Sequence, residues 1–247
     1  MKRLAAPPAW RAIDFISDLH LGADHPRTFD AWRGHLMATD ADAVFMLGDL
    51  FEVWVGDDAR GGEFESACVD VLTKASARLQ LAFMHGNRDF LVAERFSRAT
   101  GVKLLQDPTL ADLYGKRVLL MHGDTLCTDD VAYQKFRAQV RDPAWQAATL
   151  AQPLPARVAM ARQLRETSDA AKQGKEMGIM DVAPAAVEEA FRAHGCDTMI
   201  HGHTHRPGRH EHLVDGRICV RYVLPDWYGR GGYLEASAEG IRAVGLD

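Results

Sequence analysis

Five short apolar segments along the chain each end in a cluster of polar residues. Segments of this length that are rich in Val, Ile, Leu and Phe are typical of buried β-strands, although a short run by itself does not exclude a helix. Two longer segments between them, residues 64–79 and 183–194, are predicted to be helices. The predicted strands cover residues 12–17, 43–47, 81–84, 118–121 and 198–200.

Strands that alternate with helices indicate an α/β domain. Ligands of such domains bind beyond the carboxyl ends of the strands, and the polar clusters of this chain fall at those ends. Residues 217–223, 232–235 and 241–244 are short apolar runs with glycine turns, and we expect them to add antiparallel strands to a sheet. Glycines are expected to let the backbone turn sharply at three of the strand ends, at Gly48, Gly86 and Gly202.

Residues 131–180 differ from the rest of the chain in composition and charge. They are rich in Ala, contain long helical runs and are interrupted by three prolines. Eight Lys or Arg residues against four Asp or Glu give this segment a net charge of +4, while the rest of the chain carries −9. We therefore expect a core of residues 1–130 and 181–247 with a helical insertion of residues 131–180. A solvated helical hairpin is the simpler interpretation of a basic segment, and a lid over an anionic substrate is the alternative.

Composition narrows the class of protein. With 47% hydrophobic and 26% charged residues, the chain is neither disordered nor collagen-like. Four cysteines without a C-x-x-C pair argue against a zinc ribbon and a disulfide framework. The N-terminal apolar run is too short for a signal peptide, and no segment approaches the ~20 apolar residues that span a bilayer, so we expect an intracellular protein. A net charge of −5 gives little support to nucleic-acid binding.

The polar clusters at the strand ends offer carboxylate, imidazole and amide groups. This mixed set of nitrogen and oxygen atoms suits divalent ions such as Mn²⁺, Fe²⁺ or Zn²⁺. Asp18 and His20 are two residues apart, so on an extended segment their side chains point the same way, and His203 and His205 repeat this spacing. Seven ligands suffice for two ions if one carboxylate bridges, and two ions ~3.5–4 Å apart form the usual clamp for phosphoester hydrolysis. The candidates are Asp18, His20, Asp49, Asn87, His122, His203 and His205.

The ordered set Asp-x-His, Gly-Asp, Gly-Asn-Arg-Asp, His and Gly-His-x-His resembles the calcineurin-like metallophosphoesterase superfamily, over residues 12–125 and 197–225. The resemblance implies an α/β fold in which two facing mixed sheets form a sandwich flanked by helices. It also implies two metal ions that share Asp49. One ion would be held by Asp18, His20, Asp49 and His205, and the other by Asp49, Asn87, His122 and His203.

One position departs from the superfamily pattern. Many members have His after the Gly-Asn pair, where it is taken to act on the leaving group, whereas this chain has Arg88. An arginine stays protonated and cannot serve as a general acid at neutral pH, but it can bind a phosphate oxygen. A good leaving group, such as a phosphate of a diphosphate, therefore fits this site better than a simple alkoxide.

Longer strings narrow the resemblance to one family, the Gram-negative enzymes that cleave UDP-2,3-diacylglucosamine in lipid A synthesis. The similar strings are residues 47–58, 85–91, 121–130, 179–182 and 201–207. This resemblance implies hydrolysis of the diphosphate by attack at the α-phosphorus, release of UMP and 2,3-diacylglucosamine 1-phosphate, and a preference for Mn²⁺. It implies catalytic roles for Asp49, Asn87, Arg88 and His203.

The same resemblance implies that the insertion caps the site and holds the glucosamine and the acyl chains. Apolar residues such as Leu150, Leu154 and Val158 would line the acyl chamber, although the packing face of a helical hairpin is the commoner role for such a stripe. The implied substrate-binding positions are Asn87, Arg88, Asp130, Ser168, Lys172, Lys175 and His203.

A lipid-linked sugar nucleotide and a basic insertion together favour peripheral attachment to the cytoplasmic face of the bacterial inner membrane, since each Lys or Arg near an anionic surface contributes about 1 kcal/mol. No nucleic acid and no obligate protein partner is expected. Two alternatives stay open. The chain could be a metallophosphoesterase that acts on soluble nucleotides or another phosphoester, or it could be a non-catalytic scaffold, although a scaffold would be expected to have lost ligands.

Overall fold

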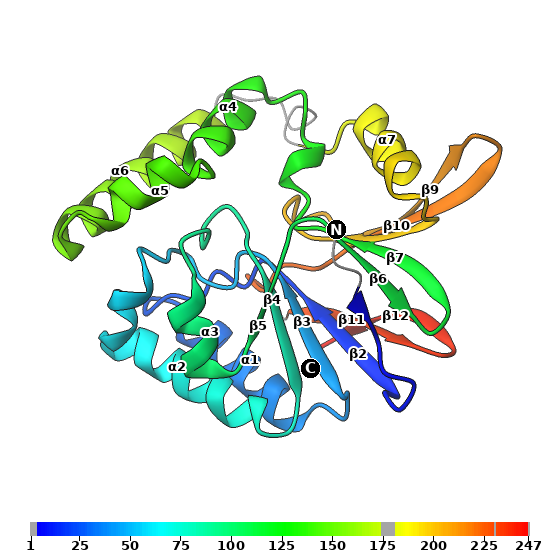
Figure 1. Ribbon diagram of the computed structural model, residues 1–247, viewed down its shortest axis with the longest axis horizontal. Coiled ribbons are helices and arrows are strands. Elements are labelled where there is room, and N and C mark those ends of the chain that lie inside the picture. The colour runs from blue at the N-terminus through cyan, green and yellow to red at the C-terminus, as the bar shows by residue number, and fades with distance from the viewer. Residues whose placement is uncertain (1–3, 174–180, 230, 247) are drawn as a thin grey trace.

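Two six-stranded sheets lie face to face, with helices on their outer faces (Figure 1). The computed structural model describes residues 4–173, 181–229 and 231–246. The first sheet has the order β12 (Gly240–Gly245), β11 (Gly232–Ser237), β2 (Ala12–Ile16), β3 (Ala43–Leu47), β4 (Gln80–Met84) and β5 (Lys103–Leu105). The second has the order β1 (Leu4–Ala5), β6 (Thr109–Leu113), β7 (Lys116–Leu120), β8 (Thr198–His201), β10 (Arg217–Val223) and β9 (Gly208–Val214).

The period-2 alternation of the strands gives each sheet two apolar faces. In β2, Ile13 and Phe15 enter the core between the sheets, whereas Ile16 faces the helices that cover the first sheet. Val118 and Leu120 of β7 reach the same inter-sheet core from the second sheet. Because both faces are covered, the central strands are apolar at nearly every position, which is typical of parallel strands in an α/β fold.

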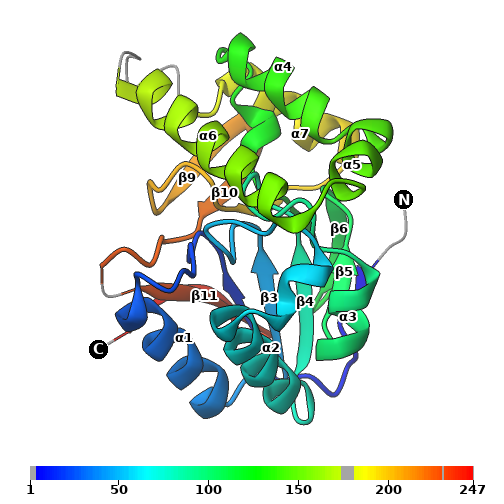
Figure 2. The same cartoon turned by 90° about the vertical axis from the view of Figure 1, so that its left-hand side faces the viewer.

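Four helices complete the sandwich. α1 (Pro26–Ala38), α2 (Glu63–Ser76) and α3 (Glu94–Thr100) pack on the outer face of the first sheet, where Trp32, Leu72 and Phe96 are fully buried (Figure 2). α7 (Pro184–His194) covers the second sheet through Val187 and Phe191. The predicted sandwich of two mixed sheets flanked by helices is therefore confirmed.

The sequence predicted the positions of the central strands and of two helices, but not all of the strand pairing. The five predicted strands correspond to β2, β3, β4, β7 and β8, and the two predicted helices correspond to α2 and α7. β11 and β12 are antiparallel additions to the first sheet, as expected. For residues 217–223 the expectation is confirmed for one neighbour only, because β10 pairs antiparallel with β9 but parallel with β8. The chain first runs along β9 at the edge of the sheet and then turns back through β10, which lies between β9 and β8. β10 therefore runs antiparallel to β9 and parallel to β8.

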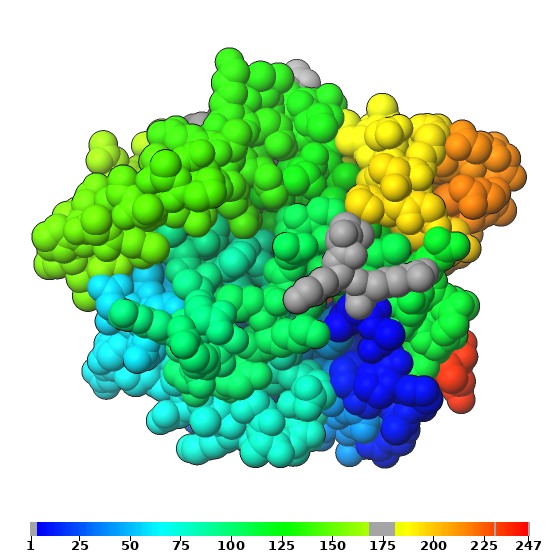
Figure 3. Space-filling model, viewed as in Figure 1, coloured from blue at the N-terminus to red at the C-terminus, as the bar shows by residue number. Residues whose placement is uncertain are grey.

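Three further helices, α4 (Val131–Val140), α5 (Pro143–Leu150) and α6 (Leu154–Gln173), lie over the carboxyl ends of the central strands, and we call them the lid helices (Figure 2). The space-filling view shows them resting directly on the core (Figure 3). Among the described residues, no helix is both long enough and apolar enough to span a membrane. That residues 131–180 form a unit separate from the core stays a prediction.

Candidate metal centre

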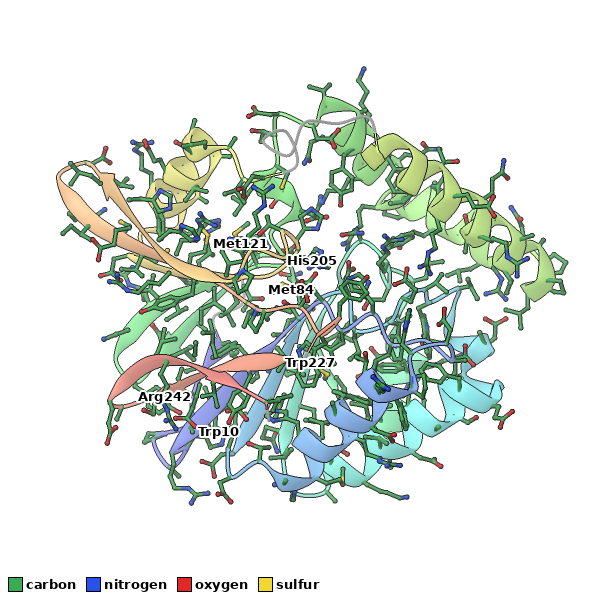
Figure 4. All side chains as sticks on the ribbon, turned by 180° about the vertical axis from the view of Figure 1, so that it is seen from behind. Trp10, Met84, Met121, His205, Trp227 and Arg242 are labelled. Carbon is green, nitrogen blue, oxygen red and sulfur yellow. The ribbon has the colours of Figure 1, made fainter. Side chains whose placement is uncertain are left out.

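The carboxyl ends of strands from both sheets meet beneath the lid helices. Figure 4 shows the position: Met84 at the end of β4, Met121 just after β7 and His205 after β8 lie near one another, while Trp10 and Arg242 mark the opposite end of the sandwich. All seven candidate ligands stand in the loops that follow these strand ends. The loop after β2 holds Asp18 and His20, those after β3, β4 and β7 hold Asp49, Asn87 and His122, and the loop after β8 holds His203 and His205.

Two overlapping groups of ligand atoms form at this place. The potential ligand atoms of Asp18, His20 and His205 lie within 4.8 Å of one another, and the same holds for Asp18, Asp49 and His122. The carboxylate of Asp49 reaches both groups, with Oδ2 at 3.8 Å from Nε2 of His20 and Oδ1 at 3.9 Å from Nε2 of His122. Asp18 is a member of both groups, and Asp49 lies within 4 Å of a histidine from each.

Asn87 links His203, the remaining candidate histidine, to His122 in the second group. Its Oδ1 lies 3.1 Å from Nε2 of His122 and 2.9 Å from Nδ1 of His203. The structure thus brings all seven candidate ligands into one continuous cluster, in which the two sheets contribute different members. Their assignment as metal ligands stays a prediction.

The backbone of five candidate ligands is not extended, which corrects the argument made from the spacing of Asp18 with His20 and of His203 with His205. Asp18, His20, Asp49, His203 and His205 all have φ between 50° and 68°, in the left-handed region. Residues other than glycine rarely adopt this conformation, and where they do, the surrounding structure holds them in it, commonly at functional sites. The paired side chains of each Asp-x-His or His-x-His motif therefore reach the centre from a pair of left-handed turns.

The glycines before these ligands serve two purposes. Gly48 has φ of 95° and does allow a sharp turn. Gly86 and Gly202 do not have a positive φ, so the bends that follow them do not depend on a conformation reserved for glycine. Glycine is needed there because a Cβ would lie 2.1 Å from Oδ1 of Asp49 at position 86 and 2.2 Å from Oδ2 of Asp18 at position 202. These glycines let the loops approach the two carboxylates closely.

The rings of His122 and His205 are each oriented by a partner on the nitrogen that faces away from the centre, as is usual for metal-binding histidines. Nδ1 of His122 donates to the carbonyl oxygen of Leu47 at 2.9 Å. Nδ1 of His205 lies 3.2 Å from the carboxylate of Asp226. In both rings Nε2 is left facing the centre.

Buried polar atoms at the centre lack partners of their own. Nε2 of His20 and Oδ1 of Asp18 have no hydrogen-bond partner among the described residues. An unpaired buried polar atom is costly, and a cation placed between these atoms would satisfy both. The donor set and these two atoms therefore fit a divalent metal ion.

The charges at the centre shift the pKa values of its histidines. Burial disfavours the charged ring of His122, but the carboxylates of Asp49, Asp124 and Asp18 outweigh it and raise the pKa of His122 to about 9. Burial and the nearby charge of His122 lower the pKa of His203 to about 4. Three carboxylates around one point create a potential that favours a cation, and His203 is in the neutral form that metals bind.

The structure describes the side chains of four predicted substrate-binding residues, Asn87, Arg88, Asp130 and His203, but not those of the other three. The backbone N–H of Arg88 donates to Oδ1 of Asp49 at 2.8 Å, and its half-buried guanidinium group lies at the edge of the centre. Asp130 is the N-cap of α4, where its Oδ1 accepts a hydrogen bond from the backbone N–H of Tyr133 at 3.0 Å. This structural role was not predicted from the sequence. The side chains of Ser168 and Lys172 on α6, and the whole of Lys175, lie outside the described residues.

Several residues around the centre were not predicted. Oδ2 of Asp124 accepts hydrogen bonds from the hydroxyl of Tyr133 at 2.9 Å and from Nε of Arg137 at 2.7 Å, and it thereby ties α4 to the loop after β7. Tyr228 stacks on the ring of His20, with centroids 5.2 Å apart. Asp124 belongs to the motif that follows β7, so spacing could have indicated it, but no local signal distinguishes Tyr228 from other surface aromatics.

The lid helices are attached to the core by polar and aromatic contacts. Nη2 of Arg141 donates to the carbonyl oxygen of Gly86 at 2.8 Å. The ring of Trp145 in α5 packs against Phe90, with centroids 6.1 Å apart. Arg157 in α6 is buried and donates to the carboxylate of Asp58. These contacts hold the lid helices directly over the loops that carry the candidate ligands.

Comparison with known proteins agrees with this geometry. The family described as calcineurin-like phosphoesterase matches residues 12–207. A UDP-2,3-diacylglucosamine hydrolase of Stenotrophomonas maltophilia is 47% identical over 235 residues, which cover 92% of this chain and 95% of the relative. A protein of the same name from Xanthomonas oryzae pv. oryzae is 48% identical over 236 residues, covering 92% of this chain and 96% of the relative.

The solved structures that align with this chain are of proteins with much lower sequence identity. The solved structure of an archaeal phosphodiesterase aligns with a TM-score of 0.49 and 13% identity, covering 95% of this chain and 99% of that one. The assignment therefore rests on the family match, which spans most of the chain, and on the two relatives. This chain belongs to the calcineurin-like phosphoesterase family.

Proposed function

We propose that this protein hydrolyses the diphosphate bond of UDP-2,3-diacylglucosamine and releases UMP and 2,3-diacylglucosamine 1-phosphate, a step of lipid A synthesis. The observation that carries the proposal is a cluster of seven candidate metal ligands beneath the lid helices, in a chain that is 47% identical to a UDP-2,3-diacylglucosamine hydrolase over 92% of its length. The cluster would hold the metal ions that the hydrolysis requires. The lid helices would provide a binding surface for an elongated lipid substrate.

The candidate ligands would hold two divalent ions, which we propose to be Mn²⁺. When bound, such ions lower the pKa of a bound water from 15.7 to about 7 and neutralise charge on a phosphate. Asp49 would bridge the ions because its carboxylate faces both ligand groups. We propose that Asp18, His20 and His205 complete one site and that Asn87, His122 and His203 complete the other.

Arg88 supports a diphosphate as the bond that is broken. Its guanidinium group is permanently charged, so it binds phosphate oxygens and does not transfer a proton to the leaving group. A sugar phosphate leaves readily without protonation, in contrast to an alkoxide. The water that attacks the α-phosphorus therefore displaces 2,3-diacylglucosamine 1-phosphate, and Arg88 stabilises the charge that develops on the phosphates.

The lid helices support a lipid substrate. Leu150, Leu154 and Val158 are 40%, 36% and 45% exposed, and all three belong to the hairpin of α5 and α6. Leu150 also lies close to Gly56 in the loop after β3. Exposed apolar side chains such as these provide favourable contacts for acyl chains. Further substrate contacts are proposed for Asp130, Ser168, Lys172 and Lys175.

We also propose that the protein works at the cytoplasmic face of the inner membrane as a peripheral protein. An amphiphilic substrate resides in the membrane, and residues 131–180 carry a net charge of +4. Sedimentation with vesicles tests this proposal. We expect binding to vesicles that contain phosphatidylglycerol at low salt, with release as salt screens the charges. A protein that stays in the supernatant under both conditions contradicts it.

The decisive experiment compares two substrates in the presence of Mn²⁺. We expect rapid release of UMP from UDP-2,3-diacylglucosamine and little release from the same sugar nucleotide without its acyl chains. Equal turnover of both, or hydrolysis of soluble nucleotides alone, would retain the two-metal chemistry and reject the lipid substrate. Metal analysis of the same sample determines whether manganese is the ion bound.

A further inference from the structure

Glu52 is a buried carboxylate between the candidate metal centre and the lid helices. It lies three residues after Asp49, and its side chain is only 6% exposed. Three groups surround it: the ring of His20, the guanidinium of Arg88 and the guanidinium of Arg165. They come from the loop after β2, the loop after β4 and the lid helix α6. A buried carboxylate is costly unless it is paired, and Glu52 is paired from three segments of the chain.

The two oxygens of Glu52 serve different partners. Oε2 lies 3.1 Å from Nδ1 of His20. Oε1 lies 2.9 Å from Nη1 of Arg165 and 3.5 Å from Nη1 of Arg88. One oxygen therefore faces the candidate metal centre, and the other faces the lid.

The contact with His20 determines how its ring is presented. With Nδ1 directed at Glu52, Nε2 points towards the centre, where it lies 3.8 Å from Oδ2 of Asp49. A carboxylate behind a ligating imidazole fixes the tautomer and the ring orientation and makes the ligand more basic. Glu52 thus stands where it can strengthen metal binding without contacting the metal.

The contacts with the two arginines assemble positive charge at one edge of the centre. Arg88 is anchored to the core by its backbone, whereas Arg165 is carried by the lid. Two guanidinium groups repel each other, and the shared carboxylate oxygen offsets that repulsion. Held in this way, both groups are available to form bidentate contacts with phosphate oxygens.

We propose that Glu52 is a positioning residue that joins the metal centre to the lid. Oε2 fixes the ring of His20 for metal binding, while Oε1 holds Arg88 and Arg165 together, so that α6 stays over the centre with two guanidinium groups facing the substrate phosphates. The phosphate role rests on the proposed function, whereas the metal and lid roles do not.

The different tasks of the two oxygens suggest a pair of variants that separates them. In Glu52→Gln the amide oxygen still faces Nδ1 of His20, but the amide NH₂ then faces the two arginines and repels them. Glu52→Ala removes both contacts. Arg165→Gln removes the contact between Glu52 and the lid and leaves those of Glu52 with His20 and Arg88 in place. Arg162→Gln is the matched control, since Arg162 is an exposed residue of the same helix that makes no ion pair with the described part of the chain.

Two measurements on these variants need no substrate. In Mn²⁺ titrations we expect Glu52→Ala to weaken binding by about 10- to 100-fold, while Glu52→Gln and Arg165→Gln stay close to the wild type. In hydrogen exchange, we expect faster exchange of the backbone amides of residues 154–167 in Glu52→Gln and Arg165→Gln but not in Arg162→Gln. Circular dichroism identifies any variant that has failed to fold.

Three results would overturn the proposal. Wild-type metal affinity in a folded Glu52→Ala protein removes the role at His20. Equal exchange in Arg165→Gln and Arg162→Gln removes the role at the lid. In the hydrolysis assay we expect Glu52→Gln and Arg165→Gln to raise KM about tenfold. An unchanged KM in variants that still hydrolyse UDP-2,3-diacylglucosamine rejects the phosphate role. That result leaves the proposed function intact.

Discussion

The carboxylate of Asp49 lies beside both groups of candidate ligands, since its two oxygens are 3.8 Å and 3.9 Å from Nε2 of His20 and His122. We predict that Asp49→Ala abolishes hydrolysis, since neither metal site keeps its full set of ligands. The assay is UMP release with saturating Mn²⁺. Asp30→Ala, which changes an exposed carboxylate on α1, serves as the control and should behave as wild type. Substantial turnover in a folded Asp49→Ala protein would refute the two-metal site.

Arg88 provides a test at the residue scale that separates substrate binding from metal binding. A hydrogen bond to a charged group contributes about 1.5–3 kcal/mol, so Arg88→Ala should lower kcat/KM by about ten- to a hundredfold. Metal content should stay unchanged, because the hydrogen bond from Arg88 to Asp49 comes from its backbone N–H, which alanine retains. Elemental analysis of the purified variant checks this. Loss of metal would show that Arg88 is a structural residue.

At the scale of elements, Arg157 attaches the hairpin of α5 and α6 to the core. Its guanidinium donates to Oδ1 of Asp58 at 2.8 Å and to the carbonyl oxygen of Val55, and its Nε donates to the carbonyl oxygen of Gln152 at 3.0 Å. Arg157→Ala leaves the buried Val55 carbonyl without this donor, which costs about 1–3 kcal/mol. We predict a decrease of that size in the free energy of unfolding, measured by urea denaturation.

The control for this variant is Arg162→Ala on the same helix. A surface substitution of this kind changes stability by no more than about 0.5 kcal/mol. If both variants lower stability equally, the contact between Arg157 and the core does not hold the hairpin in place.

The residue at which the lid helices begin could be predicted from the sequence, but their contacts with the core could not. The insertion was expected from residue 131, and α4 begins at Val131 behind the cap provided by Asp130. Capping is a local interaction that the sequence encodes within a few residues. The contacts of Arg141, Arg157 and Arg165 with the core join positions far apart in the chain, and no periodicity reveals them.

For the whole molecule, the candidate metal centre joins the two sheets. Asp18 and Asp49 follow strands of the first sheet, and His122 and His205 follow strands of the second. An ion that binds only the folded chain stabilises it by about 2.7 kcal/mol at a hundredfold excess over its Kd. At roughly 2–4 °C per kcal/mol for a chain of this size, Mn²⁺ should raise Tm by about 5–10 °C over the EDTA-treated protein.

Thermal unfolding with Mn²⁺ and with EDTA measures this difference, and Asp49→Ala provides the control, because it should lose most of the shift. A Tm that does not respond to Mn²⁺ would mean that the ligands are not occupied in the folded protein. Magnesium at the same concentration distinguishes tight binding from a general effect of ionic strength.

The sequence by itself determined which residues could form the centre and which elements carry them. Short apolar strands ending in Asp, Asn and His are local patterns, and their alternation with helices restricts the fold to a few architectures. Tertiary structure decided the rest. The left-handed backbone of Asp18 and His205, the parallel pairing of β10 and the three partners of Glu52 all depend on packing between distant segments. Such packing is set by the free energy of the whole fold, so a pattern of neighbouring residues does not contain it.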